Sequence, residues 1–208
     1  MSVADSVKTQ VVTVGDKEYL RVTLEDKVFD LPFVMIGGNK VAFLDISGQV
    51  SMNEKSADLL VKKMLEAGVT FDTILNPVAK SNALAHAIAV RWAEQVNPEL
   101  THTVVARKAK GGEHHAVEAS YKSVTTSVEQ SLYLTDDDVA YMNGKKVLLV
   151  DDVYGGGGTT KALRSLVEQA GATVSAHAVV AVEEGGSYPE GLVYLYTCLL
   201  YTSPSPRD

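Results

Sequence analysis

A single stretch, residues 147–163, constrains this chain more than any other; it reads VLLVDDVYGGGGTTKAL. Its four leading apolar residues predict a buried strand that ends at two adjacent carboxylates, Asp151 and Asp152. Four glycines follow, and Thr159 and Thr160 then open a helical pattern. Glycines without a Cβ let backbone N–H groups surround an anion, and a helix N-terminus adds partial positive charge. The stretch therefore predicts a phosphate-binding loop at the carboxyl end of a strand.

The order of these parts excludes two commoner nucleotide-binding loops. A P-loop requires Gly-Lys-Ser or Gly-Lys-Thr, whereas Lys161 here follows two threonines. A dinucleotide-binding fingerprint places its glycines directly after the strand and its acidic residue about twenty positions later. Here the acids come first, and because carboxylates repel a phosphate, Asp151 and Asp152 must face hydroxyl donors or a cation. We expect a ligand that carries a phosphate on one side and vicinal hydroxyls on the other.

The remainder of the chain predicts an α/β fold. Short apolar runs alternate with segments of helical period from residue 53 onward. This alternation predicts an open, mostly parallel sheet with helices on both faces. The expected strands are 71–75, 103–106, 146–150 and 173–182, and the expected helices are 53–65, 81–96 and 159–170.

Two further regions have patterns of their own. Residues 10–46 alternate as strands do, with turn residues at 15–16 and 37–39, which predicts a β-rich N-terminal region built from hairpins. Residues 108–118 are polar, contain glycine and lack periodicity, which predicts a flexible loop. The following residues, 121–126 and 130–134, predict a two-stranded flap.

Composition narrows the function classes. The chain has 19 basic and 26 acidic residues, a net charge of −7, so we expect no nucleic-acid binding through a broad basic face. Its longest apolar stretch, residues 192–201, is too short to span a bilayer, so we expect no membrane partner. The N-terminal residues lack the pattern of a secretory signal, and the single cysteine, Cys198, cannot form an internal disulfide. A cytoplasmic protein is the expectation.

Residues 147–159 resemble the 5-phosphoribosyl-1-diphosphate (PRPP) motif of the type I phosphoribosyltransferases, in which an apolar strand, two acids, two apolar residues, two small residues and Gly-Gly precede a Ser or Thr. The run VVARKAKG, residues 104–111, is similar to the basic strand end that opens the family's flexible active-site loop. YKSVTT, 121–126, and LYL, 132–134, resemble the return of that loop in adenine phosphoribosyltransferase-like proteins. The similarity covers roughly residues 71–185.

The resemblance implies a domain organisation. We expect one phosphoribosyltransferase domain over residues 1–197, in which about residues 1–50 form a β-rich hood over the base. The remaining residues, 198–208, read CLLYTSPSPRD and are predicted to be a disordered or non-native tail that the fold can lose. The resemblance also implies a homodimer.

The resemblance implies a role for each residue of the site. Asp151 and Asp152 would hold the ribose 2′- and 3′-hydroxyls. A loop over residues 76–81, with Lys80, would contact pyrophosphate, and Arg107 and Lys108 would clamp it, Arg107 counting with the two aspartates as catalytic. The 5′-phosphate would be bound by the glycine loop and the hydroxyls after it: Gly155, Gly156, Gly157, Gly158, Thr159 and Thr160.

The implied cofactor is Mg²⁺. It would be bound through PRPP rather than by direct ligation, with Asp151 and Asp152 as the candidates if a carboxylate touches it. The substrates would be PRPP and a purine base.

The implied reaction is transfer of the phosphoribosyl group from PRPP to adenine, giving AMP and pyrophosphate in purine salvage. Enzymes for 6-oxopurines carry an aspartate where this chain has Gly155, which disfavours that subclass. A phosphoribosyltransferase for xanthine or another base is the first alternative. A non-catalytic, PRPP-sensing regulator is the second; the region before Asn53 lacks the basic winged-helix pattern of such regulators, and Arg107 and Lys108 are kept.

Overall fold

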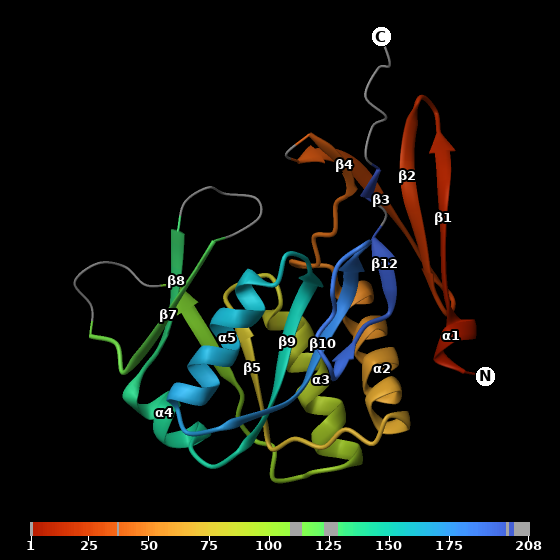
Figure 1. Cartoon of the computed structure of the whole chain (residues 1–208). Helices are drawn as coiled ribbons and strands as arrows, with labels where there is room; N and C mark the ends of the chain where they lie inside the picture. Colours follow the sequence, from red (N-terminus) through yellow and green to blue (C-terminus); the bar gives the residue numbers. More distant parts are fainter. Residues whose placement is uncertain (1, 37, 109–113, 123–128, 199, 202–208) are drawn as a thin grey trace.

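The computed structural model describes residues 2–36, 38–108, 114–122, 129–198 and 200–201. Its central sheet has the strand order β11-β10-β9-β5-β6-β8-β7, with β12 also paired to β10 (Figure 1). The core of this sheet is parallel, because β10 pairs with β9, β9 with β5, and β5 with β6 in that sense. These four strands are β5 (Thr73–Pro77), β6 (Val104–Lys108), β9 (Lys146–Tyr154) and β10 (Thr173–Glu183).

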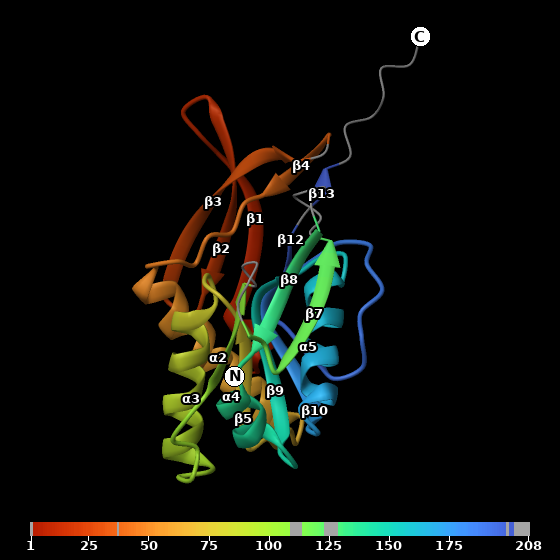
Figure 2. The same ribbon diagram turned by 90° about the vertical axis from the view of Figure 1, so that its left-hand side faces the viewer.

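Helices cover both faces of the sheet, as the alternation predicts. Strand β9 shows this best: Leu148 and Val150 pack with the side chains of α2 and α3, whereas Val147 and Leu149 pack with those of α5. Figure 2 shows α2 and α3 on one side of the strands and α5 on the other. A strand that is apolar on both faces must be buried on both. The helices are α2 (Val50–Glu66), α3 (Asn82–Gln95) and α5 (Gly158–Gln169), with the short α4 (Asp136–Met142) before β9.

A β-hairpin extends the sheet beyond β6. Strands β7 (Val117–Lys122) and β8 (Glu129–Leu134) are antiparallel, and β8 pairs with the end of β6. The predicted flap is thus confirmed for its described residues, although β7 begins earlier than expected. Residues 123–126 of the predicted flap and 109–113 of the predicted loop lie outside the described residues.

The N-terminal region forms a second sheet, of order β1-β2-β3-β4-β13. After the short α1 (Val3–Ser6), its strands are β1 (Val7–Val14), β2 (Lys17–Leu24), β3 (Lys27–Ile36) and β4 (Asn39–Ala42). The predicted hairpin turns are confirmed between β1 and β2 and between β3 and β4, and the sequence reading missed the turn at residues 25–26. This sheet, the hood, stands over the edge at which β9 and β10 end (Figure 1).

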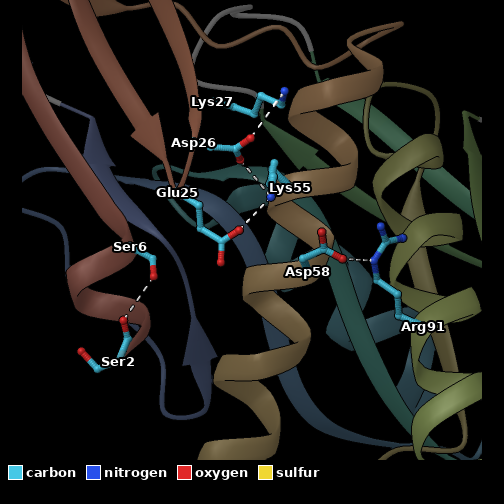
Figure 3. Close-up of polar contacts among 8 residues, drawn as sticks. All are labelled: Ser2, Ser6, Glu25, Asp26, Lys27, Lys55, Asp58 and Arg91. Atoms are coloured by element: carbon cyan, nitrogen blue, oxygen red, sulfur yellow. Dashed lines mark hydrogen bonds and ion pairs between the residues drawn. The ribbon is translucent and has the colours of Figure 1, made fainter.

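Ion pairs anchor the hood to the core. The Lys55 ammonium of α2 lies 2.7 Å from the Glu25 carboxylate and 3.1 Å from that of Asp26, in the turn between β2 and β3 (Figure 3). Arg91 of α3 donates to Asp58 of α2 at 2.5 Å, which ties the two helices together. Each pair is partly exposed and contributes little to the stability of the fold. The Lys55 pairs link the hood turn to α2, while the buried side chains of β2 supply the packing: Leu20, Val22 and Leu24.

Strand pairing continues past residue 197, the expected boundary of the domain. Cys198 is the last residue of β12 (Tyr196–Cys198), pairs in register with Glu183 of β10, and is 2% exposed. The short β13 (Leu200–Tyr201) then pairs antiparallel with β4 and so joins the hood. The apolar stretch 192–201 is compatible with a strand, but its local pattern does not show which strands it pairs with, because two-residue strands depend on the partner strand. Residues 202–208 of the predicted tail lie outside the described residues. β11 (Leu192–Val193) completes the sheet.

Residues 198–201 should therefore stabilise the fold measurably. A chain that ends after residue 197 should melt below one that ends after residue 201, because it loses the buried Cys198 side chain and the β13–β4 pairing. The loss should be about 2 kcal/mol, or about 4–8 °C in Tm for a chain of this size. Thermal denaturation of the two chains followed by circular dichroism measures it. Equal Tm values for the two chains would show that residues 198–201 add nothing to stability, as a domain that ends at residue 197 requires.

Candidate functional site

A cavity of about 230 Å³ lies between the carboxyl edge of the sheet and the hood. Its core side is formed by the end of β9, the glycine loop and the start of α5. Strand β10 contributes Glu183 and the loop after β5 contributes Lys80. On the hood side it is lined by apolar side chains: Ile36, Val41, Ala42, Phe43 and Leu44. Open α/β sheets bind ligands at this edge.

The glycine loop is shaped for close contact with backbone. Gly157 is the N-cap of α5 and has the left-handed φ of +78°, which glycine adopts without strain. A Cβ on Gly158 would lie 2.7 Å from the carbonyl oxygen of Lys122 in β7, so only glycine lets β7 approach the loop. Thr159 and Thr160 follow in the first turn of α5 and line the cavity, together with Gly155, Gly156, Gly157 and Gly158. The structure thus gathers the whole predicted cradle at one helix N-terminus, where an anion is favoured.

The predicted acid pair lies beside the cradle. The backbone N–H of Asp152 donates to Asp151 Oδ1 at 2.9 Å, and that of Val153 donates to Asp152 Oδ1 at 2.8 Å. Burial, reinforced by the neighbouring Asp152 charge, raises the pKa of the Asp151 carboxyl well above its usual value, while the Lys80 charge opposes the rise. Such a pair is stabilised by hydroxyl donors or by a cation.

Lys80 reaches the same cavity from the loop after β5. Its Nζ lies 5.4 Å from the centroid of the Phe43 ring, a cation–π contact between core and hood. The preceding Val78–Ala79 peptide is cis. The predicted pyrophosphate loop therefore places its one cation next to the acid pair.

Arg107 and Lys108 lie elsewhere. They end β6, and neither lines the cavity. Arg107 Nη1 instead donates to Asp138 Oδ2 at 2.5 Å, in the first turn of α4. Burial works against ionisation of Asp138, yet hydrogen bonds from Thr135 and Arg107 lower the pKa of its carboxyl. The structure thus gives Arg107 an ion-pair partner that the sequence reading did not foresee, and the pyrophosphate clamp stays a prediction.

Several residues of the cavity were missed by the sequence reading. The pattern of a strand does not show which of its side chains meet a distant loop, so it does not identify the hood residues of the cavity. Lys122 sits in the flap segment, where no motif marks it, and Cys198 was assigned to the tail. Glu183 could have been found, since it ends the predicted strand 173–182 just as the acid pair ends 146–150.

The cavity offers carboxylate donors for a metal ion. Among the residues that the structure describes, no three side chains of His, Cys, Asp or Glu gather as a metal site. Asp151 and Asp152 offer the carboxylate oxygens that Mg²⁺ prefers, and two partly buried like charges on adjacent residues favour a cation. The pair therefore fits Mg²⁺ shared with a phosphate-bearing ligand. No helix within the described part of the chain is long and apolar enough to cross a membrane.

Known proteins that are similar to this chain are phosphoribosyltransferases. The family model for the phosphoribosyl transferase domain matches residues 51–203. Adenine phosphoribosyltransferase of Thermosipho melanesiensis is 30% identical over 157 residues, which are 73% of this chain and 81% of that protein. Adenine phosphoribosyltransferase of Corynebacterium diphtheriae is 54% identical over 44 residues, 21% of this chain and only 24% of that protein, so this match spans about a quarter of the relative.

Solved structures share the fold. Adenine phosphoribosyltransferase from Thermoanaerobacter pseudethanolicus superposes with a TM-score of 0.57 at 22% identity, covering 72% of this chain and 83% of that one. The enzyme from Trypanosoma brucei, crystallised with AMP, pyrophosphate and ribose-5-phosphate, superposes with a TM-score of 0.53 at 19% identity, covering 94% and 77%. The sheet and its helices are thus those of the type I phosphoribosyltransferase fold.

Neutralising Asp151 should stabilise the unliganded protein. Because the pKa of this carboxyl is higher in the folded state than the unfolded value of about 3.9, ionising it costs stability as the pH rises above about 4. Asp151→Asn removes that cost and keeps an acceptor for the Asp152 N–H. The variant should melt about 2–4 °C above the parent at pH 8. The advantage should shrink towards zero as the pH falls below about 4, which thermal melts across this range measure.

The matched control is Asp16→Asn, in the exposed turn between β1 and β2. It removes one negative charge without touching the buried pair, so its Tm at pH 8 should stay within about 2 °C of the parent. An Asp151→Asn protein that melts below the parent at pH 8 would show that the carboxylate holds the fold together.

Proposed function

The chain belongs to the phosphoribosyltransferase family, and from this premise we propose that it transfers the 5-phosphoribosyl group of PRPP to adenine, giving AMP and pyrophosphate. The observation that carries the proposal is the meeting of the acid pair and the glycine cradle in one cavity. A ligand that fits both the cradle and the acid pair must carry a phosphate and a diol. The cradle suits a phosphate monoester, whereas the carboxylates would repel one and suit a diol.

The cradle would bind the 5′-phosphate. The donors would be the backbone N–H groups of Gly156 to Gly158 and the hydroxyls of Thr159 and Thr160, at the start of α5. The partial positive charge of the helix N-terminus adds to their attraction for the phosphate. Asp151 and Asp152 would then accept hydrogen bonds from the ribose 2′- and 3′-hydroxyls. These contacts fix the sugar so that its C1′ is presented to the rest of the cavity.

The pyrophosphate would lie towards Lys80, the cation that the loop after β5 brings into the cavity. Mg²⁺, held by PRPP beside Asp151 and Asp152, would supply charge neutralisation for the departing pyrophosphate. Loss of the pyrophosphate leaves positive charge on the sugar ring, as in glycoside hydrolysis. The neighbouring carboxylates would stabilise that charge without forming a bond to it. That the enzyme acts as a homodimer in the cytoplasm stays a prediction of the sequence.

The base would occupy the hood side of the cavity. Its apolar lining there suits the faces of a purine ring, with Phe43 as the aromatic contact. Adenine is favoured among purines by two observations. Gly155 supplies no carboxylate from the loop itself, and the relatives that match this chain are adenine enzymes by name.

Incubation with PRPP, Mg²⁺ and one base at a time tests the proposal. Adenine should be converted to AMP with stoichiometric pyrophosphate, and kcat/KM for hypoxanthine, guanine or xanthine should be at least about tenfold lower, since each presents an acceptor where adenine presents an amino donor. Chromatography of the nucleotide products measures this. Turnover of hypoxanthine without turnover of adenine would overturn the choice of base.

The acid pair gives the matched mutational test. Asp151→Asn and Asp152→Asn each weaken a charged hydrogen bond and should lower kcat/KM for adenine about tenfold to a hundredfold. Asp16→Asn, which removes an equal charge from the exposed hood turn, should leave it unchanged within about twofold. Full activity of both site variants would show that the pair does not hold the ribose.

A further inference from the structure

Glu183, at the end of β10, is a cavity residue without an assigned role. Its side chain is half-buried and lines the same cavity as the acid pair. A Cβ on Gly155 would lie 2.9 Å from the Glu183 carboxylate carbon and from both its oxygens. The absence of a side chain at 155 thus leaves the space that this carboxylate occupies, in the cavity that Asp151 and Asp152 also line.

Among the described residues, no cation or hydrogen-bond donor is paired with the Glu183 carboxylate. Two titratable groups lie close to it: the Cys198 thiol, on the neighbouring strand β12, and Tyr188, whose hydroxyl donates to the Glu183 backbone carbonyl at 2.6 Å. The charged groups that share its cavity are Asp151 and Asp152 of β9, Lys80 and Lys122. Burial raises the pKa of Glu183, and burial together with the Glu183 charge raises the pKa of Cys198 to about 12. A half-buried carboxylate without a donor is costly, unless a ligand supplies the donor.

The reaction leaves one candidate for that donor. This step rests on the proposed function. The 5′-phosphate and the pyrophosphate are anions that a carboxylate repels, and the ribose hydroxyls face Asp151 and Asp152. The base is uncharged and carries N–H groups. It also has to lose one ring proton when it becomes a nucleotide.

We propose that Glu183 is a further catalytic residue: its carboxylate accepts a hydrogen bond from a ring N–H of the base and takes that proton as the nucleotide forms. The ring nitrogen's electron pair makes the new bond to C1′. The C1′–O bond breaks, and its electron pair leaves with the pyrophosphate. The N–H proton passes to Glu183, which balances the charge.

The surroundings of Glu183 suit this step. A half-buried carboxylate is a stronger base than an exposed one because the protonated form costs less to bury. Since β9 and β12 flank β10, the carboxylate is fixed on a rigid strand end rather than on a loop. The raised pKa should appear as an acidic limb in the pH profile of kcat/KM, where protonation of Glu183 removes the acceptor.

Glu183→Gln tests the step, with Glu184→Gln, the exposed next residue, as the matched control. Glu183→Gln should lower kcat/KM for adenine at least about tenfold and flatten the acidic limb of its pH profile. The rise in Tm that PRPP with Mg²⁺ produces should be unchanged, because the cradle and the acid pair are intact. Glu184→Gln should match the parent in every measurement.

Gly155→Ala supplies a second, independent variant. Its Cβ would push the carboxylate aside without removing it, so it should also lower kcat/KM for adenine. Combined with Glu183→Gln it should cost less than the product of the two single losses, because both act on one group. If Glu183→Gln lowers the Tm of the free protein, Glu183→Asp, which keeps a carboxylate, should recover activity and the acidic limb in part.

The outcomes separate the two proposals. A parent protein that converts no base with PRPP overturns the proposed function. A parent that makes AMP, with Glu183→Gln within about threefold of it and an unchanged pH profile, overturns the role of Glu183 alone. Strictly multiplicative losses in the Gly155→Ala combination also overturn it, since the two residues would then act separately.

Discussion

Two like-charged carboxylates on consecutive residues, Asp151 and Asp152, lie in the carboxyl-terminal half of β9, and the rest of the site depends on holding them together in this partly buried position. Burial and the neighbouring Asp152 charge raise the pKa of the Asp151 carboxyl, and the Lys80 charge offsets that rise only in part. Strand β9 can place this pair because its apolar residues are packed on both faces and it has a strand on each side. The site is thus fixed at the cost of stability in the free protein.

The glycines after the pair serve three different purposes. Gly157 provides the left-handed turn that starts α5, and Gly158 lets the Lys122 carbonyl of β7 come close. Gly155 leaves room for Glu183 to reach the cavity from the next strand. Three of the four consecutive glycines are therefore required for different physical reasons, so a substitution at each of them should disturb a different contact.

The hood is joined to the core by contacts between residues far apart in the sequence, which no local sequence pattern predicts. Lys55 pairs with the turn between β2 and β3, Lys80 lies against Phe43, and β13 returns from the C-terminal part of the chain to pair with β4. Together they place an apolar wall opposite the acid pair. The side of the cavity that would meet the base therefore depends on segments from both ends of the chain.

Local sequence determined the parts of this protein whose physics is local. The period of apolar residues predicted the parallel sheet with helices on both faces, and the order of acids, glycines and threonines after residue 150 predicted the cradle, because these depend on neighbours in the chain. Tertiary structure alone decided which distant side chains complete the cavity. Glu183, Lys122 and the hood residues reach it through strand pairing and loop closure, Arg107 is drawn to Asp138 by a helix that follows the flap, and Cys198 enters the sheet because β10 offers an open edge. Pairing across such separations is set by the shape and charge of the partner surface, which no window of sequence contains.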